Sequence, residues 1–195
     1  MTAVPAPSTF AARLAAIAQR EYDDYHIYDE NDPALTQRIK HYWDTLGFAF
    51  PGVETAWSAV FVSYCVKVAG ATSAEFKFAA AHSIFVHKAI QNRDNSVGVF
   101  RAYDIPEESA RVGDIIQNNR GGSSHDYSFA RTNTAYISHS AIVVARGEDA
   151  HGKFAITVGG NESDSVRRQI VRLNDDGSVT QKPNHYYICL IKDLK

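Results

Sequence analysis

The stretch A-W-S-A-V-F-V-S-Y-C-V-K-V-A-G, residues 56–70, carries the strongest structural signal in this sequence. It is almost entirely apolar and ends in glycine, a pattern typical of a buried helix that stops at a left-handed residue. We therefore expect a helix over about residues 55–68, with Trp57 and Ser58 in its first turn. Backbone N–H groups in a first turn have no partner within the helix and form the positive end of its dipole.

Further helical patterns lie on both sides of this segment. Apolar residues recur at helical spacing over residues 8–21, and an Asp-Pro pair opens a second helix over residues 32–46. The acidic and aromatic stretch 22–31 between them is expected to be a loop. After the central helix, a further helix is expected over about residues 79–92.

The second half of the chain has a β-rich pattern. Strands are expected over residues 112–117, 140–146, 154–158, 166–173 and 185–191, separated by turn signals. Helices followed by strands indicate an α+β domain, with N-terminal helices packed on a C-terminal antiparallel sheet. The polar segment 118–136 is expected to be a long loop at the rim of a cleft.

Length and charge narrow the class of protein. The 195 residues fit a single domain, 1–195, with N-terminal helices in 1–50, the central helix and its successor in 51–94, and the sheet in 95–195. A net charge of −2 excludes a nucleic-acid or membrane binder driven by bulk positive charge. Arg13 interrupts the most apolar part of the N-terminal stretch, so we expect no secretory signal.

The two cysteines, Cys65 and Cys189, both lie in apolar runs and are expected to be buried free thiols. A single bridge between them remains open if the protein works in an oxidising compartment. Cys65 lies two helical turns beyond Ser58, which places it in the core and excludes it as a nucleophile.

Ser58 is the first candidate for chemistry. A hydroxyl among the free N–H groups of a helix start lies where negative charge is stabilised, on a nucleophile or on a substrate oxyanion. Serine is also a common helix cap, and these residues alone leave that structural role open.

Four segments, taken in order, resemble the NlpC/p60 and CHAP peptidoglycan hydrolases. Residues 56–70 resemble that family's nucleophile helix, with patterns such as W-C-A-A-F-V-S-W, and Ser58 falls on the catalytic cysteine. R-V-G-D-I-I, residues 111–116, is similar to the P-G-D-L-V strand entry. S-H-S-A-I-V-V-A, residues 138–145, is similar to H-V-G-I-Y and matches His139 to the family's histidine. G-G-N-E-S-D-S, residues 159–165, resembles the E-G-N strand end and points to Asn161.

This resemblance covers roughly residues 50–173 and implies a papain-like fold. The most similar pattern is an uncharacterised NlpC-like branch with W-S-A-x-F-x-S and G-G-N-x-S-D-S. It implies that Ser58, His139 and Asn161 act as nucleophile, base and orienting residue, as in Cys-His-Asn sites. No cofactor is implied.

Serine in place of cysteine is a departure from the family. A cysteine beside a histidine is substantially ionised, whereas a serine hydroxyl must lose its proton during attack. Three explanations remain open: a branch that uses serine, an inactive domain, or a deliberate replacement of the cysteine.

Other side chains are candidates for the same cleft. His82 lies near the start of the helix expected over residues 79–92, Glu54 lies one turn before Ser58, and Asp164 lies three residues beyond Asn161. Glu54, His82 and His139 could together activate a water, although the chain has no recognised metal-binding spacing. Trp57 is a further candidate, as the neighbour of Ser58.

The function implied is a peptidoglycan amidase or endopeptidase that cuts a stem-peptide amide by acyl transfer. With no export signal expected, the resemblance further implies an antibacterial effector toxin, made in the cytoplasm, delivered by a type VI secretion system and active in the target periplasm. Its partners would be peptidoglycan, a delivery protein and a cognate immunity protein, with no nucleic acid and no membrane insertion. A phage lysin is one alternative. An inactive papain-like module that binds wall fragments or a protein is the other.

Overall fold

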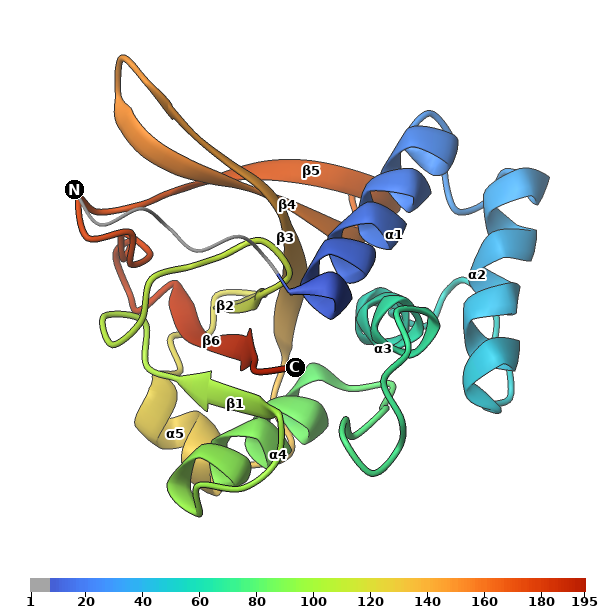
Figure 1. Cartoon of the computed structure of the whole chain (residues 1–195). Helices are drawn as coiled ribbons and strands as arrows, with labels where there is room; N and C mark the ends of the chain where they lie inside the picture. The colour runs from blue at the N-terminus through green and yellow to red at the C-terminus, as the bar shows by residue number, and fades with distance from the viewer. Residues whose placement is uncertain (1–7) are drawn as a thin grey trace.

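The computed structural model describes residues 8–195 and shows an α+β fold (Figure 1). N-terminal helices pack on a six-stranded antiparallel sheet of order β1-β6-β2-β3-β4-β5. The α+β class and the antiparallel sheet are therefore confirmed. Residues 1–7, part of the stretch in which we expect no secretory signal, lie outside the described residues. Over residues 8–195, every helix is too short or too polar to cross a membrane.

The first two helices are α1, Thr9–Tyr25, and α2, Pro33–Leu46. The Ser8 side chain accepts a hydrogen bond from the Ala11 amide at 3.0 Å and so caps α1. Helix α1 continues four residues past the predicted end at residue 21, because no glycine or proline interrupts this stretch. The predicted loop over 22–31 was therefore wrong for its first four residues. Helix α2 ends at Leu46, as predicted, and is capped by Gly47, whose φ is +76°.

Helices α3, Ser58–Val68, and α4, His82–Asp94, both begin three residues later than predicted. Trp57 has non-helical backbone angles and is the cap of α3, so Ser58 is the first helical residue. His82 likewise opens α4. Both candidate side chains consequently lie at helix starts, where the free backbone N–H groups are.

The predicted strands are all present, with shifted ends, and two elements were not predicted. The strands are β1 (Phe100–Tyr103), β2 (Ile115–Asn119), β3 (Ser138–Asp149), β4 (Gly152–Glu162), β5 (Ser165–Arg172) and β6 (Tyr187–Asp193). The unpredicted ones are β1, a four-residue edge strand paired with β6, and α5, Tyr127–Thr132. Helix α5 lies inside the predicted loop over 118–136 and is capped by the Asp126 side chain.

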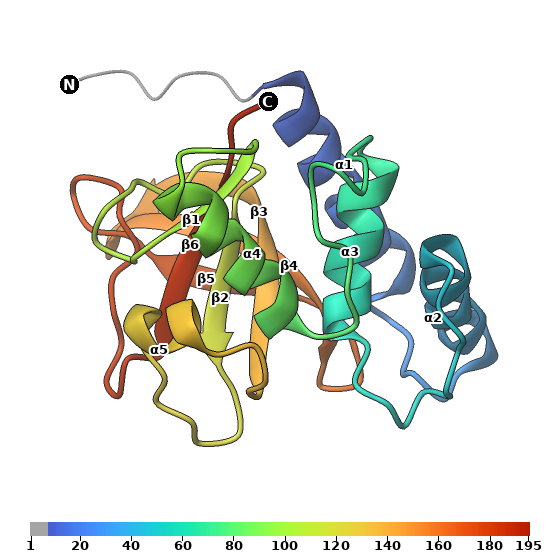
Figure 2. The same cartoon turned by 90° about the horizontal axis from the view of Figure 1, so that it is seen from below.

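The sheet is buried on both faces around its central strands. Ile115 of β2 joins the large cluster that also contains the helices, while the adjacent Ile116 joins a second cluster on the other face. Helix α3 lies between α2 and the sheet and contacts β3 and β4 (Figures 1 and 2). This packing brings the start of α3 against the end of β4.

Gly160 permits the close approach of α3 to β4. A Cβ atom at this position would lie 2.5 Å from Trp57 Cζ3 and 2.7 Å from Phe61 Cβ, and both side chains are fully buried. Gly160→Ala is therefore expected to lower the free energy of unfolding by about 1–3 kcal/mol, the usual cost of overpacking. Urea unfolding measures this change.

Gly147→Ala is the matched control for Gly160→Ala, because it also adds a methyl group to the β3–β4 hairpin. The added methyl group would meet the end of the Phe154 ring, and this half-buried side chain can rotate away. A Gly160→Ala protein as stable as wild type would contradict the packing described above.

Candidate active site

A buried hydrogen bond joins the two helix starts. Ser58 Oγ lies 2.7 Å from His82 Nε2, and the two residues are only 3% and 6% exposed. The distance is that of a nucleophile and its base. Two of the predicted candidates, Ser58 and His82, are therefore in direct contact.

The surroundings of His82 keep its ring neutral. Burial lowers the pKa of His82 well below its usual value of 6.5, and the nearby His139 and Arg120 lower it further. A neutral imidazole has one nitrogen free to accept a proton. We assign the Ser58 hydroxyl as donor to Nε2, with the ring proton of His82 on Nδ1.

A second histidine, His139 of β3, is paired with a carboxylate. Its Nε2 donates to Glu162 Oε1 at 2.9 Å, and Gln169 Nε2 donates to the other carboxylate oxygen at 3.0 Å. The carboxylate fixes the ring proton on Nε2, so Nδ1 carries the free lone pair. His139 Nδ1 is buried and has no hydrogen-bond partner among residues 8–195.

The two histidines are neighbours. Their ring centroids are 5.6 Å apart with an interplanar angle of 65°, an edge-on contact. Ser58, His82, His139 and Glu162 thus form one continuous cluster from the start of α3 to the end of β4. Within residues 8–195, the hydroxyl of Ser58 bonds to His82, and no hydrogen bond joins it to His139.

The hydrogen bond expected between His139 and Asn161 is made by Glu162 instead. Asn161 donates from Nδ2 to Glu30 Oε2 at 3.0 Å and receives Arg120 Nη1 on Oδ1 at 3.4 Å. The pairing of β4 with β5 shifts register between Gly159 and Glu162, and Asn161 has a φ of +56°. This local turn places the side chain after Asn161 against the histidine.

Gly159 leaves the space for this pair. A Cβ atom on Gly159 would lie 2.8 Å from His139 Nε2 and would also collide with Glu162 Oε1. The glycine that precedes Gly160 therefore has a role at the site itself, since any larger residue would displace the histidine or its carboxylate.

The remaining candidates lie at the edge of this cluster or away from it. Trp57 is fully buried and donates from Nε1 to Glu30 Oε2 at 2.8 Å. Asp164 is exposed, and its carbonyl accepts from the Glu30 amide at 2.8 Å. Glu54 is exposed in the segment before α3 and does not join the hydrogen bonds of Ser58 or His139.

Neither thiol belongs to the site. Cys65 and Cys189 are both free and fully buried, and burial raises the pKa of each well above its usual value. Cys65 lies in the core, as predicted. Over the part of the chain that the structure describes, no three His, Cys, Asp or Glu side chains are grouped so that they could hold a metal ion.

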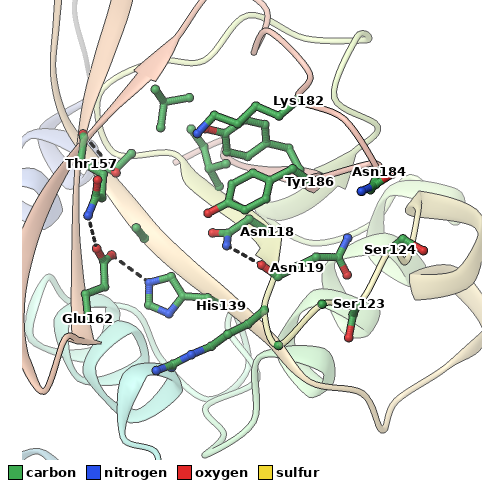
Figure 3. A pocket seen from close by; sticks show the side chains of 18 of the residues that line it. Asn118, Asn119, Ser123, Ser124, His139, Thr157, Glu162, Lys182, Asn184 and Tyr186 are labelled. Carbon is green, nitrogen blue, oxygen red and sulfur yellow. Dashed lines mark hydrogen bonds and ion pairs between the residues drawn. The ribbon is translucent and has the colours of Figure 1, made fainter.

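A pocket of about 760 Å³ borders the cluster (Figure 3). His139 and Glu162 lie on one side of it, opposite Lys182 and Tyr186. Residues 118–124 line part of it, so the predicted cleft-rim segment does border a cavity at its start. Ser58 and His82 do not line it. The pocket thus reaches the cluster at His139.

Glu162 and Glu30, which hydrogen-bond to predicted site residues, were missed by the sequence analysis. Glu162 directly follows Asn161 in the G-G-N-E stretch. A carboxylate next to the predicted orienting residue could have been considered as the partner of His139. Glu30 lies in the segment between α1 and α2, and nothing local relates it to residues 57 and 161.

One protein-family model matches the chain, over residues 30–189, and it describes an uncharacterized protein conserved in bacteria, DUF2272. The match contains Ser58, His82, His139 and Glu162. No curated protein and no solved structure matches the chain. Because the match spans most of the sequence, the chain belongs to the DUF2272 family of bacterial proteins.

Proposed function

We propose that this protein hydrolyses an amide bond in the stem peptide of peptidoglycan, through an acyl-enzyme formed on Ser58. The observation that carries the proposal is the 2.7 Å hydrogen bond between Ser58 Oγ and His82 Nε2 at the start of a buried helix. This contact brings a nucleophile on α3 together with a neutral base on α4, beside the free backbone N–H groups of the first turn of α3.

In the first step, Ser58 Oγ attacks the amide carbonyl carbon and its proton passes to His82 Nε2. The carbonyl oxygen becomes an oxyanion, which backbone N–H groups at the start of α3 stabilise. The C–N bond then breaks, and the departing amine takes the proton from His82. The products are the free amine and an ester on Ser58, with His82 neutral again.

In the second step, a water hydrolyses the ester. His139 lines the pocket and has a free Nδ1 lone pair, while Glu162 holds its other nitrogen. We propose that His139 removes a proton from this water as the water attacks the ester carbonyl carbon. As the ester C–O bond breaks, the proton that His139 took from the water passes to the Ser58 oxygen. This restores the Ser58 hydroxyl and the neutral His139, and the carboxylic acid leaves.

The stem peptide as substrate rests on the resemblance to the NlpC/p60 and CHAP hydrolases. A helix that begins with the nucleophile and packs on an antiparallel sheet bearing the histidine supports a papain-like arrangement. By the same resemblance we propose an antibacterial effector, delivered by a type VI secretion system and blocked by an immunity protein that covers the pocket.

The test is digestion of purified peptidoglycan sacculi, with the released fragments identified by mass spectrometry. We expect fragments from the wild-type protein and from Ser58→Cys, and none from Ser58→Ala. Fragments from Ser58→Cys alone would mean that the serine protein is inactive. No fragments from any of the three would overturn the proposal.

His139→Ala separates the two steps. If His139 activates the water, the variant still acylates Ser58 but releases the acid slowly, so an acyl-enzyme accumulates. Intact-protein mass spectrometry after mixing with a soluble stem peptide would show the added acyl mass. A variant that never acylates would instead assign His139 to the first step.

A second candidate function is a binding module without catalysis. It is favoured by one observation: Ser58 and His82 are almost fully buried and do not line the pocket. Under this reading, Ser58→Ala binds sacculi as tightly as wild type, and neither protein releases fragments.

A further inference from the structure

Glu30 connects the two halves of the candidate active site through a single carboxylate oxygen. Its Oε2 accepts from Trp57 Nε1 at 2.8 Å and from Asn161 Nδ2 at 3.0 Å. Trp57 directly precedes Ser58, and Asn161 directly precedes Glu162. The carboxylate therefore joins the residue before the nucleophile to the residue before the histidine's partner.

Glu30 is itself held at both backbone groups. Its amide donates to Asp164 O at 2.8 Å, and its carbonyl accepts from Thr36 Oγ1 at 2.7 Å. One of these contacts ties it to the turn after β4, and the other ties it to the first turn of α2. A side chain on a backbone that is held in this way loses less freedom when it accepts its two hydrogen bonds.

The groups that Glu30 accepts from need a partner. The Trp57 side chain is fully buried, and an indole N–H buried without an acceptor costs about 1–3 kcal/mol. Asn161 has a left-handed backbone, which persists only where surrounding contacts determine it. Arg120 holds Asn161 from the other side, through Oδ1 at 3.4 Å and the backbone carbonyl at 3.2 Å.

We infer that Glu30 is a positioning residue that fixes the Ser58–His82 pair relative to the His139–Glu162 pair, an inference that rests on the proposed function. Glu30 touches neither histidine and does not line the pocket. Its loss should therefore leave substrate binding intact and disturb the alignment of the reacting groups. Misplacement of reacting groups by about 1 Å can cost on the order of 100-fold in rate.

The expected kinetic result is a split between kcat and KM. Glu30→Ala should lower kcat by roughly 10- to 100-fold with KM little changed. Glu30→Gln keeps an oxygen that can accept both hydrogen bonds and should recover most of the lost kcat. Asp24→Ala, which removes an exposed carboxylate near the end of α1, should behave as wild type.

A measurement without turnover separates this inference from the proposed function. Side-chain ¹⁵N NMR of the histidines, assigned with His82→Ala and His139→Ala, reports the ring contacts whether or not the protein is active. We expect Glu30→Ala to shift both His82 and His139, and Glu30→Gln and Asp24→Ala to leave both in place. If Glu30→Ala does not fold, Glu30→Asp withdraws the carboxylate by one methylene group and provides the same comparison.

The outcomes are distinct. Unchanged His82 and His139 resonances in Glu30→Ala would overturn the positioning role, even in an active enzyme. Shifted resonances in a protein that releases no fragments from sacculi would retain the role and reject the hydrolase. Equal losses in Glu30→Ala and Glu30→Gln would also overturn the inference, because the accepting oxygen would then not be what matters.

Discussion

Ser58→Ala and His82→Ala are each expected to lower the rate of amide hydrolysis by at least about 10³-fold, and the double variant should be no slower than Ser58→Ala alone. The hydroxyl and the imidazole act as one unit across their 2.7 Å hydrogen bond, so removing either ends the same step. Catalytic groups that act together are strongly non-additive. Initial rates on a soluble stem peptide measure all three variants.

His87→Ala is the matched control for His82→Ala, because His87 lies on the same helix and its ring nitrogens hydrogen-bond to the Ala130 carbonyl and the Gln91 side chain, away from Ser58. It should keep wild-type activity. If the losses in the Ser58/His82 double variant were instead additive, the two residues would act in separate steps. The proposed proton transfer between them would then be wrong.

The sequence predicted the helices whose signals lie within a short segment of the chain. The apolar run after Trp57, the helical spacing over residues 8–21 and the Asp-Pro pair before α2 are each local to one element, and the structure has the corresponding helices. The α+β class also follows from the order of helical and alternating patterns. Strand β1 was missed because it is only four residues long and pairs at the edge of the sheet with β6, near the C-terminus.

The partner of His139 could not be predicted from strand alternation. Regular alternation decides which side chains share a face only while the register holds. Here β4 shifts register after Gly159, and Asn161, Ser163 and Asp164 all have positive φ. Because of this turn, Glu162 contacts the histidine in place of Asn161. No single residue in the G-G-N-E-S-D-S stretch predicts the shift in register.

The contacts of Glu30 are with residues far away in the sequence. It lies 27 residues from Trp57 and 131 from Asn161, so its two hydrogen bonds exist only after α1, α3 and β4 have packed. A glutamate in an acidic segment has no feature that distinguishes it from its exposed neighbours. Such tertiary contacts explain why the pairing of the candidate residues could not be predicted from the sequence.

Lys192→Met is expected to lower the free energy of unfolding by about 1–2 kcal/mol at pH 7. Without the lysine, the buried Asp114 carboxyl must be protonated, which costs about 1.4 kcal/mol for each pH unit above its pKa of about 6. Lys192 Nζ lies 3.0 Å from Asp114 Oδ2, and both side chains are 4% exposed. Burial raises the pKa of Asp114 to about 6, although Lys192 and the Arg111 amide oppose the shift. Without the lysine, the buried Asp114 side chain keeps only the hydrogen bond from the Arg111 amide.

The loss of stability in Lys192→Met is expected to depend on pH. A carboxyl whose pKa is raised in the folded state binds more protons there than in the unfolded state, so stability falls as pH rises from about 4 to about 6. Removing Lys192 raises the pKa of Asp114 further and extends that fall to higher pH. The defect of Lys192→Met should therefore be about 1–2 kcal/mol at pH 7 and close to zero near pH 4.5, where Asp114 is neutral in both folded proteins.

Two further variants, measured by urea unfolding at pH 7 and pH 4.5, distinguish the effect of the charge from that of packing. Lys192→Met combined with Asp114→Asn removes both charges, keeps an acceptor for the Arg111 amide, and should recover most of the stability lost at pH 7. Lys88→Met, on the exposed side of α4, should cost little at either pH. If the double variant were as unstable as Lys192→Met at pH 7, the loss would come from the packing of the lysine stem and its bond to the Ser109 carbonyl, and the protonation of Asp114 would not be its cause.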